Sequence, residues 1–255
     1  MNAPDATPQF SLIIPAFNEA ALLPRLLDSV DVARARFART VVGNPRGCES
    51  IEVIVADNAS TDATAQIASA RGCIVSMVEQ RCIAAARNGG AAAACGDIVC
   101  FVDADMRVHP ETFNAIAACL ADPRAIAGAT GVTMERWSLG IAVTWAMVIP
   151  LVWIARLDTG VVFCRRVDFE AIGGYDVSRL YAEDVDFLWR LRALGKPRGQ
   201  KLMRPNGAKA ICSTRKFDTF GDWHFLTRMP RIGWQLLRDP HARHDFVQRY
   251  WYEDR

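Results

Sequence analysis

The sequence lacks a strong excess of charge, paired cysteine motifs and a disordered composition. Its 255 residues carry 30 Lys and Arg against 28 Asp and Glu, which gives a net charge of +2. None of the eight cysteines forms a C-x-x-C pair, which argues against a zinc site or a disulfide framework and favours buried free thiols in a reducing compartment. The hydrophobic content of 51% excludes a disordered chain and indicates one sizeable core.

A secretory signal is also missing from the beginning of the sequence. Residues 1–9 are polar, contain two prolines, and lack the basic and apolar regions of a signal peptide. We therefore expect a flexible N-terminus over residues 1–9. The expected location is cytoplasmic, with peripheral attachment to the inner face of a membrane as the alternative.

Residues 138–155 carry no formal charge, and the length of this 18-residue stretch makes it a borderline candidate for a membrane span. Trp137, Trp145 and Trp153 with flanking arginines would suit a membrane interface. Pro150 predicts a break or kink in a helix. A buried helix is the default expectation, and the alternatives are a helix in the membrane interface or a contact between subunits of a homo-oligomer.

The most informative feature that is present is a pair of aspartates, Asp103 and Asp105, directly after an apolar run over residues 98–102. Carboxylates at the mouth of a buried strand offer hard oxygen ligands where a divalent cation and a phosphate could meet. The alternative is that both residues simply end the strand. A calcium loop is excluded because Arg107 and Val108 stand where an oxygen ligand and the turn glycine would be needed.

Apolar runs alternate with helical patterns through the first half of the chain. This alternation predicts βαβ units and a mostly parallel sheet. The predicted strands are 10–15, 51–56, 73–78 and 97–102, and the predicted helices are 19–32, 62–71 and 81–94. Residues 33–50, with Gly43, Pro45 and Gly47, are interpreted as an inserted loop.

Polar clusters follow three of these strands, at residues 15–19, 57–62 and 103–105. Parallel sheets bind ligands beyond the carboxyl ends of their strands, so the clusters should share one edge. Ser60, Thr61 and Asp62 could instead cap the following helix. A later acidic cluster, residues 183–186, begins a predicted helix, where acidic side chains also complement the helix dipole. If the clusters form one site, residues 138–155 cannot be a single membrane crossing between them.

Five segments together resemble family 2 glycosyltransferases with the GT-A fold: residues 13–19, 57–62, 86–89, 103–105 and 182–186. The resemblance extends from about residue 11 to 217. It implies an α/β architecture: a single Rossmann-like GT-A domain with a mostly parallel central sheet flanked by helices. The domain would span 10–218, with a nucleotide-binding half (10–105) and an acceptor half (106–218), before a helical C-terminal extension (219–255).

The same resemblance implies an inverting, metal-assisted transfer from a nucleotide diphosphate sugar, with Mn²⁺ or Mg²⁺ as the cofactor. It assigns the nucleotide side of the site to Pro15, Phe17, Glu19, Asp57, Arg87, Asn88 and Asp103. Asp57 would accept a hydrogen bond from the base, Asp103 would lie near the ribose or the metal, and Asp105 would be a metal ligand. Asp184 would be the catalytic base, and Asp186 would only complement the helix dipole.

Three further features lie later in the chain. His224 is a candidate metal ligand because some relatives add a late histidine, although a lone histidine is more often structural. Arg215 could contact the diphosphate through charge-assisted hydrogen bonds, or be an ordinary surface residue. Gly173 and Gly174 fit a tight turn with positive φ that borders the acceptor in the family.

The partners follow from charge and family. Residues 190–255 carry 15 Lys and Arg against 6 Asp and Glu, which suits an anionic ligand or membrane surface. Nucleic acid is not expected, since these arginines form no recognised binding motif. The acceptor hydroxyl could belong to a lipid-linked sugar, a polysaccharide or a small molecule. The alternatives are a nucleotidyltransferase, whose glycine-rich loop is missing from residues 15–19, and an inactive sugar-nucleotide-binding scaffold at a membrane.

Overall fold

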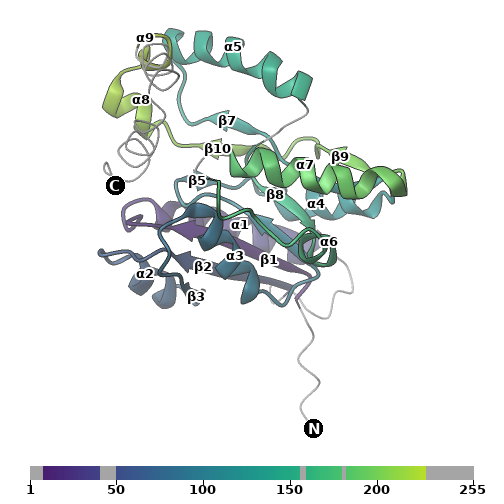
Figure 1. Cartoon of the computed structure of the whole chain (residues 1–255). Coiled ribbons are helices and arrows are strands. Elements are labelled where there is room, and N and C mark those ends of the chain that lie inside the picture. The colour runs from purple at the N-terminus through teal and green to yellow at the C-terminus, as the bar shows by residue number, and fades with distance from the viewer. Residues whose placement is uncertain (1–7, 41–49, 156–158, 180–181, 228–255) are drawn as a thin grey trace.

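The chain folds as an α/β protein around a central sheet (Figure 1), and the computed structural model describes residues 8–40, 50–155, 159–179 and 182–227. In this part of the chain the sheet has seven strands in the order β3-β2-β1-β4-β8-β6-β9. Their bounds are β3 Ile74–Met77, β2 Ile51–Asp57, β1 Phe10–Ala16, β4 Ile98–Phe101, β8 Val162–Arg165, β6 Ala125–Ala129 and β9 Lys201–Met203. The predicted mostly parallel sheet is confirmed: only β8 runs antiparallel to its neighbours β4 and β6.

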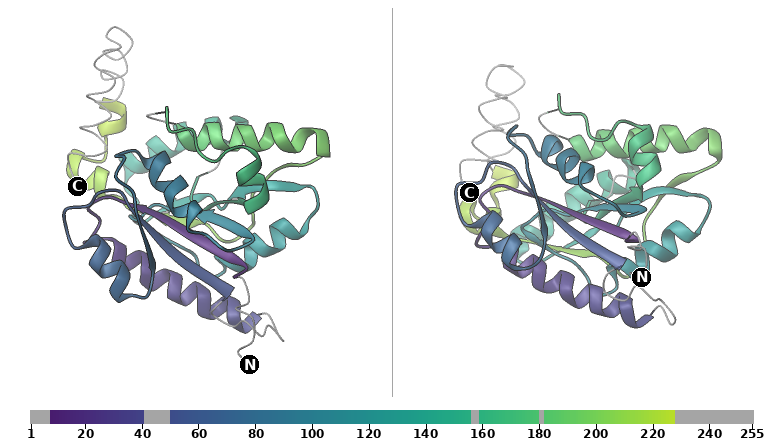
Figure 2. Two further views of the ribbon diagram at one scale, coloured as in Figure 1. Left: turned by 60° about the horizontal axis from the view of Figure 1, so that its bottom comes forward. Right: turned by 90° about the horizontal axis from the view of Figure 1, so that it is seen from below.

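Helices cover both faces of this sheet (Figure 2). Helices α1 (Leu23–Thr40) and α4 (Thr112–Ala121) share a buried cluster with Leu12 and Ile14 of β1. Helices α3 (Ile83–Ala92), α6 (Arg166–Ala171) and α7 (Glu183–Gly195) share a second cluster with Ile13. Successive residues of a strand point to opposite faces, so β1 is buried on both faces and is apolar except for Ser11.

One sequence prediction is wrong at α1. Residues 33–40, expected in a loop, continue this helix to Thr40. Ala33 and Phe37 lie one helical turn apart and are both buried, and the Phe37 ring packs edge-on against Phe10 with 5.4 Å between the ring centroids. That apolar spacing outweighs the arginines between them. Residues 41–49 lie outside the described part of the chain.

A smaller layer stands beyond one edge of the main sheet (Figure 1). It contains the three-stranded sheet β5-β10-β7 and three helices, with Met134, Ile141 and Phe217 at the centre of its buried cluster. The bounds are β5 Met106–Arg107, β7 Val132–Met134, β10 Ala210–Cys212, α5 Leu139–Ala155, α8 Arg215–Phe220 and α9 His224–Thr227. The shorter elements α2 (Thr64–Ala70) and a 3₁₀ turn at Lys196–Arg198 complete the main domain.

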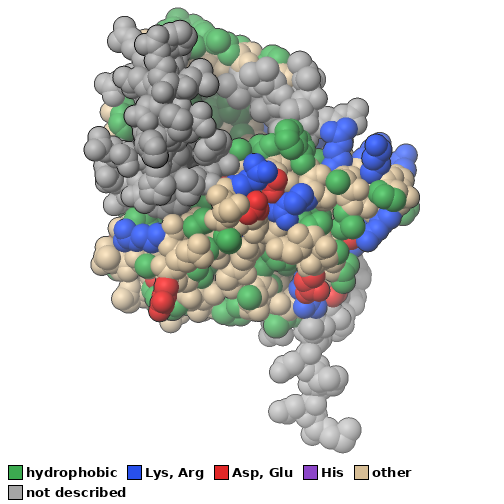
Figure 3. Space-filling view, in the orientation of Figure 1, with side chains coloured by type: hydrophobic (Ala, Val, Ile, Leu, Met, Phe, Trp, Pro, Cys, Tyr) green, Lys and Arg blue, Asp and Glu red, His purple; other side chains and the backbone are tan. Residues whose placement is uncertain are grey.

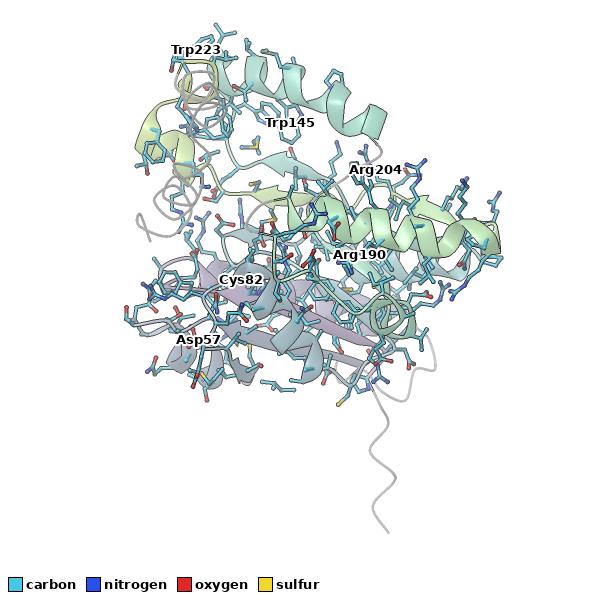
Figure 4. The ribbon with its side chains drawn as sticks, in the orientation of Figure 1. Asp57, Cys82, Trp145, Arg190, Arg204 and Trp223 are labelled. Carbon is cyan, nitrogen blue, oxygen red and sulfur yellow. The ribbon has the colours of Figure 1, made fainter. Side chains whose placement is uncertain are left out.

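Helix α5 contains most of the uncharged stretch and continues through Pro150 without ending. Ile141 is buried and Trp145 lies on the side of α5 that faces β7 (Figure 4), but Leu139 is 73% and Met147 58% exposed. The expectation of a buried helix is therefore wrong for this first part of α5, and hydrophobic surface gathers there (Figure 3). Within the described residues, no helix has both the length and the apolar content to span a bilayer. Membrane or homo-oligomer contact through residues 138–155 stays a prediction.

Candidate active site

The sheet order places the first two predicted polar clusters side by side. Strands β1 and β2 are parallel neighbours, and the loops that follow them are joined by hydrogen bonds. The Asn18 N–H donates to Ser60 Oγ (3.0 Å), the Glu19 N–H to Thr64 Oγ1 (2.9 Å), and the Ala20 N–H to Asp62 Oδ2 (3.0 Å). The hydroxyl and carboxyl groups after β2 therefore brace the loop after β1, and the two loops form one wall of the site.

The predicted nucleotide residues line this wall with little exposure. Pro15 pairs with Ala56 inside the sheet, and Phe17 is buried beneath the Arg81 guanidinium, which lies 4.4 Å from the ring centroid. Asp57, at the end of β2 (Figure 4), is also buried, and its Oδ1 accepts the Ser60 N–H at 3.2 Å. The Phe17 ring and the Asp57 carboxylate are therefore held in fixed positions by their own loops.

Arg87 of α3 joins the other two clusters. Its buried guanidinium contacts three carboxylates: Nη2 lies 2.9 Å from Asp103 Oδ1, and Nη1 lies 2.9 Å from Glu183 Oε1 and 2.8 Å from Asp184 Oδ1. Burial opposes the cation, but these carboxylates outweigh it and hold the pKa of Arg87 well above its usual value. A permanently charged arginine thus brings together the end of β4 and the start of α7, which are far apart in the sequence.

Asp184 has a carboxyl group suited to accepting a proton near neutral pH. Burial raises its pKa to about 6, against the opposing effect of the Arg87 cation and with smaller contributions from Glu183 and Asp103. Its side chain nevertheless keeps 27% of its surface accessible. A carboxylate that is partly open and has a raised pKa is typical of a general base.

Asp105 lies beside an ion pair between Glu19 and Arg215, the first residue of α8. Arg215 contacts both oxygens of the buried Glu19 carboxylate, each at 3.1 Å, and its Nη2 lies 3.4 Å from Asp105 Oδ2. The side chains of Asp103 and Asp105 are 38% and 22% exposed. Arg215 therefore links the small layer to the loop after β1, and its predicted contact with a diphosphate stays a prediction.

The two aspartates fit a divalent metal of the Mg²⁺ or Mn²⁺ type. They supply hard carboxylate oxygens and stay partly exposed. In the described residues, no group of three or more His, Cys, Asp or Glu side chains is placed to hold an ion. Magnesium sites commonly use one or two carboxylates and complete their coordination with substrate phosphates and water, so this donor set suits an ion bound together with a diphosphate.

His224 lies in a different environment from the predicted metal ligands. It is buried against the rings of Phe217, Phe220 and Phe225, and its Nδ1 is 2.8 Å from the Gly221 carbonyl oxygen. These contacts give His224 a packing role within the small layer. Its metal-binding role stays a prediction.

Asn88, predicted near the nucleotide, is placed against the turn before α7. Its Nδ2 donates to the Tyr175 carbonyl oxygen and its Oδ1 accepts the Tyr175 N–H, both at 2.8 Å. Gly173 and Gly174 have φ values of 73° and 70°, which confirms the predicted positive-φ turn. The two neighbouring residues of α3 therefore contact different segments: Arg87 contacts the start of α7, and Asn88 contacts the turn before it.

Strained backbone marks the same loops. The non-glycine residues with positive φ in the described ranges are Asn18, Ala59 and Ala182, at 51°, 60° and 57°. They follow β1, follow β2 and directly precede Glu183, respectively. Such residues cost about 1–3 kcal/mol each and cluster at functional sites, so this backbone feature, which no sequence motif predicted, supports the same location.

The chain is similar to known glycosyltransferases in both sequence and structure. A family model described as glycosyl transferase family 2 matches residues 11–143. A PGL/p-HBAD biosynthesis glycosyltransferase of Mycobacterium bovis is 27% identical over an alignment of 251 positions, and the match covers 91% of this chain and 89% of that protein. Validoxylamine A glucosyltransferase of Streptomyces hygroscopicus is 31% identical over 122 residues, or 46% of this chain, and the match spans only 26% of that protein.

Solved structures of low sequence identity share the fold. Mannosyltransferase PcManGT from Pyrobaculum calidifontis, in complex with GDP-Man and Mn²⁺, has a TM-score of 0.60 at 23% identity, covering 82% of this chain and 57% of that one. Glucosyl-3-phosphoglycerate synthase from Mycobacterium tuberculosis, in complex with Mn²⁺, UDP and glucosyl-3-phosphoglycerate, has a TM-score of 0.55 at 20% identity, covering 84% and 75%. The fold is that of GT-A glycosyltransferases, and with the family match over 11–143 the chain belongs to glycosyl transferase family 2.

Proposed function

We propose that this protein transfers a sugar from a nucleoside diphosphate sugar to an acceptor hydroxyl, with inversion at the anomeric carbon and Asp184 as general base. The observation that supports this proposal most is the Arg87 junction, which brings Asp103, on the donor side, and Asp184 around one buried guanidinium. Both carboxylates then border the edge of the sheet where parallel α/β proteins bind ligands.

On the donor side, Phe17 and Asp57 would bind the base of the nucleotide. The fixed Asp57 carboxylate is an acceptor for a base N–H, and Phe17 offers an apolar surface. Arg215, held between Glu19 and Asp105, would contact the diphosphate. The GDP-Man and UDP complexes of structurally similar proteins support a nucleotide-linked donor.

Asp103 and Asp105 would hold Mg²⁺ or Mn²⁺ together with the diphosphate oxygens. When bound, the ion supplies Lewis-acid stabilisation of the negative charge on the leaving group. The complexes of similar proteins with Mn²⁺ support this proposal. The Arg215 cation beside Asp105 would add to the same positive field.

On the acceptor side, Asp184 would take the proton of the attacking hydroxyl. The acceptor oxygen forms a bond to the anomeric carbon, and the bond from that carbon to the phosphate oxygen breaks on the opposite face. The nucleoside diphosphate leaves with the bonding electron pair, which produces inversion with a single base. The partly open Asp184 carboxylate suits this task, while the Arg87 cation favours its ionised form.

Nucleotide binding is expected to depend on a metal. In a thermal-shift panel of uridine, guanosine and thymidine diphosphates, one nucleotide should stabilise the protein clearly more with Mn²⁺ than without. At a hundred times its dissociation constant, a ligand stabilises the folded state by about 2.7 kcal/mol. Asp105→Asn should remove the metal dependence, whereas the control Asp122→Asn, at a surface pair with Arg124, should keep it. No metal-dependent shift with any of the three nucleotides would contradict the donor site.

Transfer is expected to depend on pH through Asp184. Its pKa is raised to about 6, and only the ionised carboxylate accepts a proton, so activity should be full above pH 7 and lost on acidification. With one controlling group, kcat should fall about tenfold for each pH unit below the pKa. The measurement is kcat between pH 5 and 8, with nucleotide binding followed at the same values. A rate that stays constant down to pH 5 would contradict Asp184 as the base.

A further inference from the structure

Asn88 is half-buried and forms a contact that the donor site does not require. Its side-chain amide forms a closed pair of hydrogen bonds with the backbone of one residue, Tyr175, as donor and as acceptor. This pairing copies the hydrogen bonding of neighbouring strands and fixes both peptide groups of Tyr175. A contact between Asn88 and the nucleotide would have to compete with these two bonds.

The turn before Tyr175 is shaped to receive this amide. Gly174 has a φ of 70°, and a Cβ atom at this position would lie 2.6 Å from Asn88 Oδ1. Any other L-residue at position 174 would therefore meet both backbone strain and a clash with the amide. Gly174 and Asn88 together allow one close approach of the turn to α3.

The Tyr175 ring connects this turn to the helix that carries Asp184. The ring is buried and stacks on Phe187, with 4.1 Å between the centroids and 8° between the planes. Phe187 lies three residues after Asp184 in α7. The Arg87 guanidinium also lies over the Tyr175 ring, 5.0 Å from its centroid. Movement of the Tyr175 ring would therefore disturb both the first turn of α7 and Arg87.

The Tyr175 hydroxyl lies in the neighbourhood of the Asp184 carboxylate. It is buried without a hydrogen bond of standard geometry, as is Asp184 Oδ1. The two groups are nevertheless close enough for the tyrosine to lower the pKa of Asp184 by hydrogen bonding, as a minor contribution beside burial. A buried hydroxyl without a full partner is costly, so its place near Asp184 calls for a role.

We propose that Asn88 and Tyr175 are positioning residues for the base: Asn88 fixes the backbone of Tyr175, and the Tyr175 ring and hydroxyl hold Asp184 in its place beside Arg87. This inference rests on the proposed function of Asp184. It gives Asn88 a task different from nucleotide binding, although the residue follows Arg87 directly. One turn of α3 then sets the geometry of the donor carboxylate and of the base.

The test compares Asn88→Ala and Tyr175→Phe with the matched control Asn114→Ala. Asn114 lies on α4, and its side-chain amide donates hydrogen bonds to Glu111, just before α4, and to Thr40, at the end of α1. A misplacement of about 1 Å can cost 10²-fold in rate, so Asn88→Ala should lower kcat about 100-fold and Tyr175→Phe about 10-fold. The dissociation constant of the nucleoside diphosphate and the KM of the donor should stay within about twofold of wild type if uniform binding is unaffected. Asn114→Ala should match wild type.

Hydrogen–deuterium exchange gives a readout that does not depend on activity. The Tyr175 amide donates to Asn88, so a peptide over residues 169–179 should exchange faster in Asn88→Ala and at the wild-type rate in Tyr175→Phe. Titration with the nucleoside diphosphate gives the active fraction, so that kcat is compared per folded site. A loss of fold would lower this fraction, whereas mispositioning lowers kcat per site.

Two outcomes would overturn the inference while the proposed function stands. One is weakened nucleotide binding with unchanged kcat in Asn88→Ala, which would make Asn88 a nucleotide ligand. The other is faster exchange at residues 169–179 with unchanged kcat, which would make the contact structural only. If the wild-type protein bound nucleotide but transferred no sugar to any acceptor, the proposed function would fail first, and this inference with it.

Discussion

Replacing Asp184 by asparagine is expected to abolish sugar transfer while leaving donor binding intact. The amide keeps the size of the carboxyl group but cannot accept the proton of the acceptor hydroxyl. General-base groups contribute about 10²- to 10⁴-fold, so kcat should fall by that amount. Nucleotide binding should persist because Phe17, Asp57 and Asp105 are unchanged. The measurement is kcat together with the dissociation constant of the nucleoside diphosphate.

Asp186→Asn provides the matched control for this experiment. Asp186 lies two residues further along α7 and pairs with Arg179 and Arg190, at 3.0 and 2.7 Å. These contacts agree with its predicted role at the start of a helix. The variant should keep most of its activity. Near wild-type turnover in Asp184→Asn, or equal loss in both variants, would refute the assignment of the base.

Replacing Arg87 by alanine is expected to cause the largest loss of stability. The substitution leaves Glu183 and Asp184 near each other without their shared cation. Breaking a buried ion pair by removing one partner costs about 3–5 kcal/mol, and urea unfolding at pH 7.5 should show a loss of that size. The exposed Arg192 of α7 is the control, and Arg192→Ala should change stability by less than about 0.5 kcal/mol.

The loss of unfolding free energy caused by Arg87→Ala should become smaller at low pH. Burial already raises the pKa of Asp184 to about 6, and removal of the Arg87 cation raises it further. Between pH 7.5 and pH 5 the carboxyl group of the variant therefore becomes protonated, and the uncompensated charge disappears. A loss below about 1 kcal/mol at pH 7.5, or one that grows on acidification, would contradict the role of Arg87 as the junction.

The sequence predicts the strands around the site well because they are buried on both faces. Residues 10–15, 51–56 and 97–102 are apolar except for Ser11, Glu52 and Asp97 near their starts, and β1, β2 and β4 begin and end within about two residues of these runs. Their parallel order then follows from the alternating helices. The location of the polar clusters at one edge therefore follows from the amino-acid sequence alone.

The connections between the clusters could not be derived in this way. The Glu19–Arg215 pair joins residues that are 196 positions apart, and no local pattern predicts such a contact. The three carboxylates around Arg87 and the pairing of Asn88 with Tyr175 depend equally on how the two halves pack. The last part of α1, residues 33–40, was missed for a different reason. Only Ala33 and Phe37 mark its apolar face, and the charged residues between them weaken the helical pattern.

These long-range contacts determine how the side chains of the site are arranged. Arg87 contacts Asp103 with one nitrogen and Asp184 with the other, and Asn88 holds the backbone of Tyr175. The strained residues Asn18, Ala59 and Ala182 lie on the surrounding loops. In the proposed mechanism, donor binding and base placement are coupled through a few residues of α3, which gives a reason for the buried charge there.

The most direct test is product analysis with labelled nucleotide sugars, Mn²⁺ and a panel of hydroxyl acceptors. We expect release of nucleoside diphosphate that increases with acceptor, together with a glycoside of inverted anomeric configuration. Release of pyrophosphate would instead indicate a nucleotidyltransferase. Nucleotide binding without cleavage of any donor would indicate an inactive scaffold, and either result would contradict the account.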